Sequence, residues 1–137
     1  MSEQENIRLA QQAYASFQSG DIQSLIGLMS EEIKWELPEI EGVSFAGKRS
    51  GRDQVAEFFS SLADQQDVLE FSPTDFIAQG DKVAVQGSYR WRVKATGREY
   101  GGDWVHVFTV RDGRIVRFQE YMDTAAAANA YQKAQSA

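Results

Sequence analysis

The chain has 137 residues, 42% of them hydrophobic, which is enough for one hydrophobic core and short for two domains. We therefore expect a single domain over residues 1–137. The 14 basic and 20 acidic residues give a net charge of −6, which disfavours binding to nucleic acid phosphates. Because the chain has no cysteine, it forms no disulfide and offers no thiolate as nucleophile or metal ligand.

The first residues of the chain indicate where in the cell the protein is expected. Its first twenty residues are polar and lack the apolar region of a secretion signal, and no apolar run in the sequence is long enough to span a bilayer. We therefore expect a cytoplasmic protein that has no membrane partner.

Helices are predicted in four places. Ser2-Glu3-Gln4-Glu5 has the spacing of a capping box, and Ser19-Gly20-Asp21 ends this first helix and caps a short second one over residues 22–29. A third helix is predicted over residues 51–65 and a last one over residues 124–135. The first helix carries one apolar stripe, made of Ile7, Ala10, Tyr14 and Phe17.

Strands are predicted between and after these helices. A brief strand over residues 33–37 ends at Pro38, which cannot donate to a ladder, and residues 39–50 predict an irregular loop. Two longer strands follow over residues 68–78 and 82–96. The second alternates strictly between apolar and polar side chains, as expected for an antiparallel strand with one wet face.

The most informative segment is a long hairpin predicted over residues 101–124. Asp112-Gly113 tolerates the positive φ angles of a tight two-residue turn, and such a turn pairs Val110 with Ile115 and His106 with Gln119. One face then mixes aromatic bulk with polar groups, as small-molecule pockets do. This face comprises Trp104, His106, Phe108, Gln119, Tyr121 and Asp123.

The order of these elements favours an α+β fold. Helices gathered at the start and four strands in sequence predict a curved antiparallel or mixed sheet with helices on one face. Three modest helices cannot fill such a sheet, so we expect an internal pocket between the sheet and the helices. Its predicted lining is Tyr14, Trp35, Trp91, Trp104, Phe108, Gln119 and Tyr121. The alternative for these aromatic residues is ordinary core packing.

Asp123 and His106 are the candidates for catalysis. In an apolar pocket, desolvation favours the neutral form of Asp123 and suits it to proton transfer, but Asp123 also precedes an Ala-rich segment, where Asp is a preferred helix cap. His106, the one histidine, can hydrogen-bond a ligand carbonyl or hydroxyl, and the alternative is a core histidine. In a flat ladder the two lie about 13 Å apart, so we expect two walls of one pocket. A metal site is not expected.

The hairpin pattern H-x-F-x-V-x-D-G-R-I-x-x-F-x-E-Y-x-D, followed by an Ala-rich helix, resembles the nuclear transport factor 2-like superfamily, and most closely its SnoaL-like branch. The superfamily also includes ketosteroid isomerase and limonene epoxide hydrolase. The resemblance implies a cone-shaped sheet around a pocket for a hydrophobic small molecule, and a homodimer through the outer sheet face. Residues expected at that dimer contact are Val105, Val107, Phe118 and Met122.

Two functions are compatible with this resemblance. One is a cofactor-independent isomerase, cyclase or hydrolase of an apolar carbonyl or ring compound, with Asp123 as acid or base and His106 stabilising charge or orienting the substrate. Residues 118–123 are similar to the W-R-D-Y-F-D ending of epoxide hydrolases, whose last aspartate activates water, whereas Leu37 replaces the base of ketosteroid isomerases. The other function is a dimeric ligand carrier or assembly module that uses the pocket without chemistry.

Overall fold

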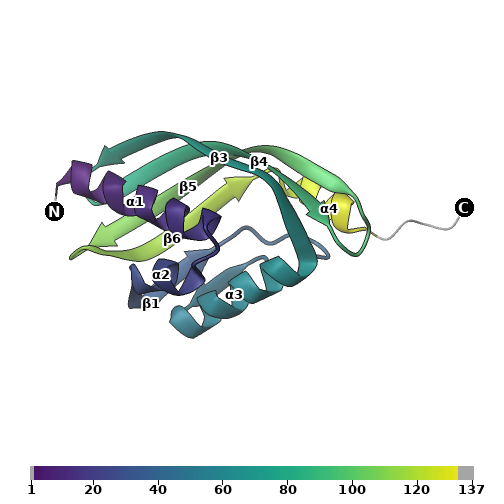
Figure 1. Cartoon of the computed structure of the whole chain (residues 1–137), viewed down its shortest axis with the longest axis horizontal. Coiled ribbons are helices and arrows are strands. Elements are labelled where there is room, and N and C mark those ends of the chain that lie inside the picture. Colours follow the sequence, from purple (N-terminus) through teal and green to yellow (C-terminus); the bar gives the residue numbers. More distant parts are fainter. Residues whose placement is uncertain (1, 133–137) are drawn as a thin grey trace, which may run out of the picture.

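The protein is described by a computed structural model that covers residues 2–132. Its helices are α1 (Glu3–Gln18), α2 (Ile22–Gly27), α3 (Arg52–Gln65) and α4 (Thr124–Tyr131) (Figure 1). Its strands are β1 (Met29–Glu36), β2 (Lys48–Ser50), β3 (Gln66–Gln79), β4 (Lys82–Val93), β5 (Glu99–Arg111) and β6 (Arg114–Met122). The predicted α+β fold is confirmed. Residues 133–135 of the predicted last helix lie outside the described residues.

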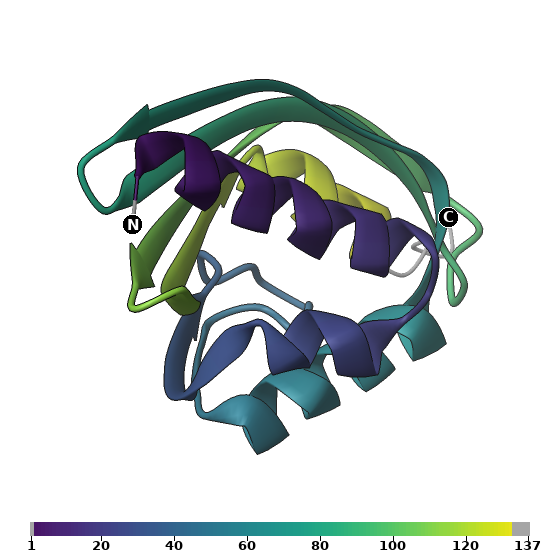
Figure 2. The ribbon, with the colours of Figure 1, turned by 60° about the vertical axis from the view of Figure 1, so that its left-hand side comes forward.

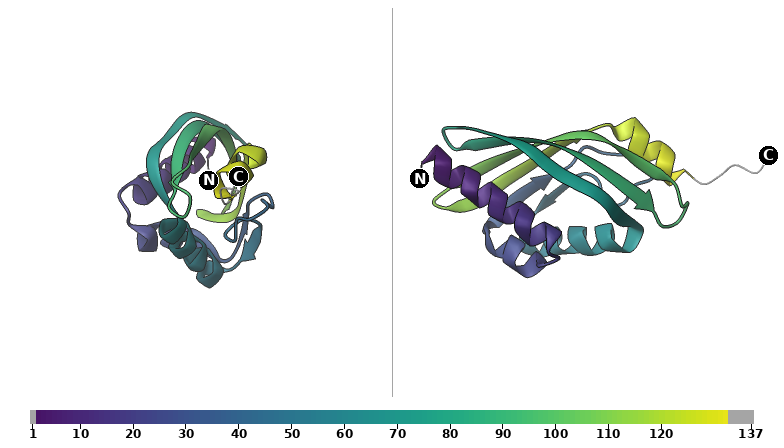
Figure 3. Two further views of the ribbon diagram at one scale, coloured as in Figure 1. Left: turned by 90° about the vertical axis from the view of Figure 1, so that its right-hand side faces the viewer. Right: turned by 45° about the horizontal axis from the view of Figure 1, so that its top comes forward.

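The six strands form one mixed sheet in the order β2-β1-β6-β5-β4-β3. β1 runs parallel to β6, and every other neighbouring pair is antiparallel. The sheet curves so that its long strands arch over α1 (Figure 2), and the view along the molecule shows the same curvature from one end (Figure 3). The short strand β2 was not predicted, because three residues show no periodicity.

Helix α1 crosses the concave face of the sheet. It begins at the predicted capping box, in which the Ser2 hydroxyl accepts from the Glu5 amide at 3.1 Å and the Glu5 carboxylate accepts from the Ser2 amide at 3.3 Å. Its apolar side packs against the sheet and buries Leu9, Ala13 and Tyr14. Tyr14 is therefore held over the interior of the sheet.

Strand β4 supplies the centre of the concave face. The alternation predicted for it is present, with Val83, Val85, Tyr89, Trp91 and Val93 all buried.

Gly87 interrupts the side chains of β4 for a steric reason. A Cβ added there would lie 2.3 Å from Cζ2 of Trp104 on β5 and 2.6 Å from the backbone oxygen of Ser72 on β3. The ring of Trp104 occupies the space that a side chain at position 87 would need.

The β5–β6 hairpin turns at Asp112 and Gly113, whose φ angles of 51° and 75° match the predicted turn. Val110 pairs with Ile115 as predicted. The next pair, however, joins Thr109 to Arg117 and leaves Val116 without a partner in the β5 ladder. This β-bulge adds one residue to β6 and exchanges the two faces of the strand beyond it.

The bulge makes the predicted register wrong beyond Val110. His106 pairs with Glu120 instead of Gln119, and Trp104 pairs with Met122 instead of Tyr121. Gln119 and Tyr121, predicted to line the pocket, lie on the outer face, where Tyr121 is 55% exposed. Two of the residues predicted at the dimer contact turn inward for the same reason and line the internal cavity, namely Phe118 and Met122.

Candidate functional site

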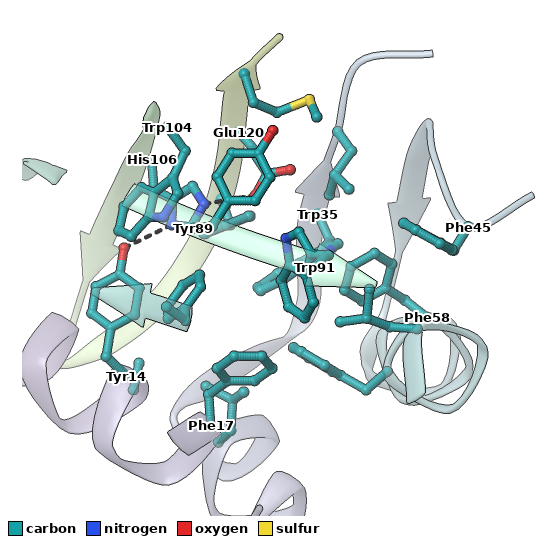
Figure 4. A pocket seen from close by; sticks show the side chains of 18 of the residues that line it. Tyr14, Phe17, Trp35, Phe45, Phe58, Tyr89, Trp91, Trp104, His106 and Glu120 are labelled. Atoms are coloured by element: carbon teal, nitrogen blue, oxygen red, sulfur yellow. Dashed lines mark hydrogen bonds and ion pairs between the residues drawn. The ribbon is translucent and has the colours of Figure 1, made fainter. Parts of the chain in front are cut away.

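A cavity of about 90 Å³ lies between the concave face of the sheet and helices α1 and α3 (Figure 4). Its wall is mostly aromatic and aliphatic. Five of the seven residues predicted to line it lie there, namely Tyr14, Trp35, Trp91, Trp104 and Phe108. An engineered apolar cavity of about 150 Å³ holds benzene, so a ligand larger than a small ring requires side chains of this wall to move.

Two hydrogen bonds join three side chains that line this cavity, forming a hydrogen-bonded chain. The Tyr14 hydroxyl lies 2.8 Å from Nδ1 of His106, and Nε2 of His106 lies 2.7 Å from Oε2 of Glu120. Three separate elements, α1, β5 and β6, supply the three side chains, which Figure 4 shows joined by dashed lines. His106 is 3% exposed, whereas the Glu120 side chain is 22% exposed and connects the chain to solvent.

The chemistry of the partners sets the direction of this chain. An ionised carboxylate can only accept, so Nε2–H of a neutral His106 donates to Glu120. Nδ1 then carries a lone pair and accepts from the Tyr14 hydroxyl. Both nitrogens of the buried imidazole are therefore paired.

Aromatic rings hold the imidazole of His106 in place. Trp104 stacks on it with centroids 3.9 Å apart and an interplanar angle of 17°, and the Phe118 ring lies on it at 4.6 Å. Trp104 is itself fixed, since its indole N–H donates to the Ser88 carbonyl at 3.1 Å. These contacts keep both ring nitrogens aligned with their partners.

Tyr14 is a neutral phenol in this environment. Burial raises its pKa well above the ordinary value of tyrosine, and the negative charge of Glu120 raises it further. Tyr14 therefore acts as a hydrogen-bonding group and not as a phenolate nucleophile.

Asp123 lies outside the cavity, so its predicted place in the pocket is wrong. It is exposed and caps α4, where its carboxylate accepts from the Ala126 amide at 3.1 Å. Asp123 therefore has the role of a helix cap, which was the predicted alternative to a catalytic role. The acid that reaches His106 is Glu120, which the sequence analysis missed because the bulge at Val116 moves it to the inner face.

The SnoaL-like domain family matches residues 10–118 of the chain. The chain belongs to this family. A nuclear transport factor 2-like protein from Burkholderia xenovorans LB400 is 32% identical, with 96% of this chain and 99% of that chain covered and a TM-score of 0.87. One from Burkholderia thailandensis E264 is 26% identical, with the same coverage and a TM-score of 0.84. The predicted SnoaL-like resemblance is confirmed.

A third similar structure is that of TerC co-crystallized with polyporic acid. TerC is 28% identical to this SnoaL-like chain, with 93% of this chain and 98% of TerC covered and a TM-score of 0.81. No protein with a curated description is significantly similar to the chain.

Two further observations concern the described part of this SnoaL-like chain. Between residues 2 and 132, no three histidine or carboxylate side chains gather as ligands for a metal ion. None of the described helices combines the length and the apolar character needed to cross a membrane.

Proposed function

We propose that this SnoaL-like protein binds a hydrophobic carbonyl or ring compound in its cavity and isomerises, cyclises or hydrolyses it by acid–base chemistry of its own side chains. The observation that carries the proposal is the hydrogen-bonded chain of Tyr14, His106 and Glu120 at the edge of a mostly aromatic and aliphatic cavity. Buried polar groups are costly unless they are paired, and here the buried Tyr14 and His106 pair with each other and with the partly exposed Glu120 beside space for a ligand.

In the proposed mechanism, Glu120 is the proton acceptor. One of its carboxylate oxygens, Oε2, accepts from His106, which leaves Oε1 to take a proton from a carbon next to a ligand carbonyl or from a ligand hydroxyl. Returning this proton to another carbon of the ligand completes an isomerisation. In a ring closure, the carbanion bonds to a carbonyl carbon of the same ligand, and the proton goes to the oxygen of that carbonyl. His106 orients Glu120 through the Nε2–H hydrogen bond, and the negative charge passes from Glu120 to the ligand when the proton moves.

The aromatic wall favours planar ligands. Aromatic side chains such as Trp35, Phe58 and Trp91 line the cavity, and stacked or tilted aromatic pairs are favourable beyond the area they bury. TerC was co-crystallized with polyporic acid, and this compound is therefore the first binding probe for the present chain.

The test combines binding with proton exchange. Polyporic acid is titrated while tryptophan fluorescence is followed, because three tryptophans line the cavity. Exchange is measured as deuterium uptake next to the carbonyl of 2-indanone in D₂O. We expect Glu120→Gln to retain binding and to lose exchange, since the amide keeps the shape and the hydrogen bond but not the basicity.

Glu99→Gln is the matched control, because Glu99 lies on the surface and pairs with Arg90 and Arg92. It is expected to bind and exchange like the wild type. Saturable binding without exchange in the wild type would overturn the catalytic proposal and support the alternative of a ligand-binding module.

We also propose that two copies associate through the outer face of the sheet. With Phe118 and Met122 turned inward, this face presents Val105, which is 36% exposed, and Tyr121, which is 55% exposed. Light scattering after size-exclusion chromatography is expected to give the mass of a dimer for the wild type and of a monomer for Val105→Glu/Tyr121→Glu. A monomeric wild type would refute this proposal.

A further inference from the structure

Two polar atoms in the cavity wall are buried without a hydrogen-bond partner among the described residues. They are Nε1 of Trp35 and the hydroxyl oxygen of Tyr89. Each of these residues is 5% exposed, and both line the cavity beside which the Tyr14–His106–Glu120 chain lies (Figure 4). Because unpaired buried polar groups are rare in folded proteins, each of these two requires an explanation.

Trp35 cannot turn to find a partner within the protein. It lies on β1 with its ring stacked on Phe118 at a centroid distance of 3.9 Å and an angle of 12°, and the rings of Phe58 and Phe59 on α3 bracket it at 5.6 and 5.4 Å. An indole nitrogen is a donor only. The atom that satisfies it must therefore be an acceptor that enters the cavity.

Tyr89 presents a second donor from β4. Its ring meets Tyr100 edge-on at 5.8 Å. Burial, followed by the negative charges of Glu120 and Asp123, raises the pKa of Tyr89 to about 12, so the phenol keeps its hydrogen near neutral pH. It is able to donate this hydrogen to an acceptor on a ligand.

Other polar groups of the same wall are paired inside the protein. Tyr14 and His106 bond each other, the Trp104 indole donates to Ser88, and the Tyr100 hydroxyl donates to Gln66 at 2.8 Å. Within residues 2–132, these four side chains thus find partners, whereas the fully buried Nε1 of Trp35 and hydroxyl oxygen of Tyr89 do not. This contrast favours recognition of a ligand over loose packing.

We infer that Trp35 and Tyr89 are the polar groups that recognise the ligand, and that this ligand is an oxygenated ring compound such as a ketone or a quinone, with acceptor oxygens for both donors. The inference rests on the proposed function, because it assigns the substrate class of the same cavity. It excludes a plain hydrocarbon as the preferred ligand, since a hydrocarbon leaves both donors unpaired.

The experiment uses two ligands of one shape, cyclohexanone and methylenecyclohexane, in which C=CH₂ replaces C=O. Each is titrated into the ¹⁵N-labelled full chain and followed by NMR. In the wild type, the indole N–H resonance of Trp35, assigned by sequential methods, is expected to shift with the ketone and not with the alkene. This measurement needs no variant.

Variants then measure selectivity. Trp35→Phe and Tyr89→Phe are each expected to weaken the binding of cyclohexanone relative to methylenecyclohexane by roughly two- to tenfold, the effect of one hydrogen bond. Tyr121→Phe on the outer face is the control and is expected to leave the ratio of the two dissociation constants unchanged.

The outcomes separate the two proposals. The inference is overturned, while binding in the cavity stands, if three results occur together: the wild type binds both ligands, the ketone does not shift the Trp35 resonance, and neither variant changes the ratio of the two dissociation constants. If the wild type binds neither of these ligands nor polyporic acid, the proposed function and the inference both fail. A ketone-specific shift together with a changed ratio supports both.

Discussion

Removing the Tyr14 hydroxyl tests whether the hydrogen-bonded chain contributes to folding. Tyr14→Phe keeps the ring that packs on Phe71, Phe76 and Trp104, but it leaves Nδ1 of the buried His106 without a partner. Leaving a buried acceptor unpaired costs about 1–3 kcal/mol. With a denaturant slope of about 2 kcal/mol per molar urea, a loss of about 2 kcal/mol lowers the unfolding midpoint by about 1 M.

Two matched substitutions make this measurement specific. Tyr121 is exposed, and Tyr121→Phe is expected to change the free energy of unfolding by less than about 0.5 kcal/mol. The Tyr89 hydroxyl is buried without a partner, so Tyr89→Phe is expected to leave stability unchanged or to increase it. If urea unfolding shows the same small change for Tyr14→Phe as for Tyr121→Phe, the assigned strength of the Tyr14–His106 bond is refuted.

Three further outcomes are expected. Gly87→Ala places a methyl group against Trp104 and should lower the free energy of unfolding, measured in urea, by about 1–3 kcal/mol. Gly27 has open space around it, so Gly27→Ala should leave the free energy of unfolding unchanged. Equal effects of the two substitutions would contradict the steric argument. Asp123→Ala removes the α4 cap and should lower the free energy of unfolding by about 1 kcal/mol, measured by thermal unfolding, while deuterium uptake by 2-indanone continues. If this uptake is lost while stability is unchanged, Asp123 becomes a catalytic candidate again. Burial raises the pKa of Tyr89 from 10.0 to about 12 and raises the pKa of Tyr14 above its ordinary value, so unfolded chains release these protons first. Urea unfolding should therefore show stability that is constant below about pH 10 and falls towards pH 12, and a flat profile would argue against the burial of these phenols.

Local patterns in the sequence predicted every helix and every strand except the short β2. The capping box at Ser2 marks the start of α1, the alternation in β4 identifies its buried face, and Asp112-Gly113 marks the turn between β5 and β6. Each of these features depends on residues close together in the chain. The hairpin motif also identified the SnoaL-like family without tertiary information.

The site was predicted only in part. His106 and the aromatic wall follow from β5 and β4, whose register has no bulge between them. Tyr14 was assigned to the pocket, but its bond to His106 depends on how α1 crosses the sheet. Glu120 was missed and Asp123 was placed inside the pocket because both lie beyond the bulge on β6.

The sequence by itself determined the four helices and all strands but the short β2, where the hairpin turns, and that one face of β5 is aromatic around a single histidine, although the predicted strands over residues 33–37 and 82–96 differ in their ends from β1 and β4. Tertiary structure decided which acid meets that histidine. β6 lies between β1 and β5, and Ile115 pairs with Met29 on one side and Val110 on the other. A strand that pairs with a parallel and an antiparallel neighbour has its register set by both, and the extra residue at Val116 brings Glu120 to the cavity because strand side chains alternate with a period of two.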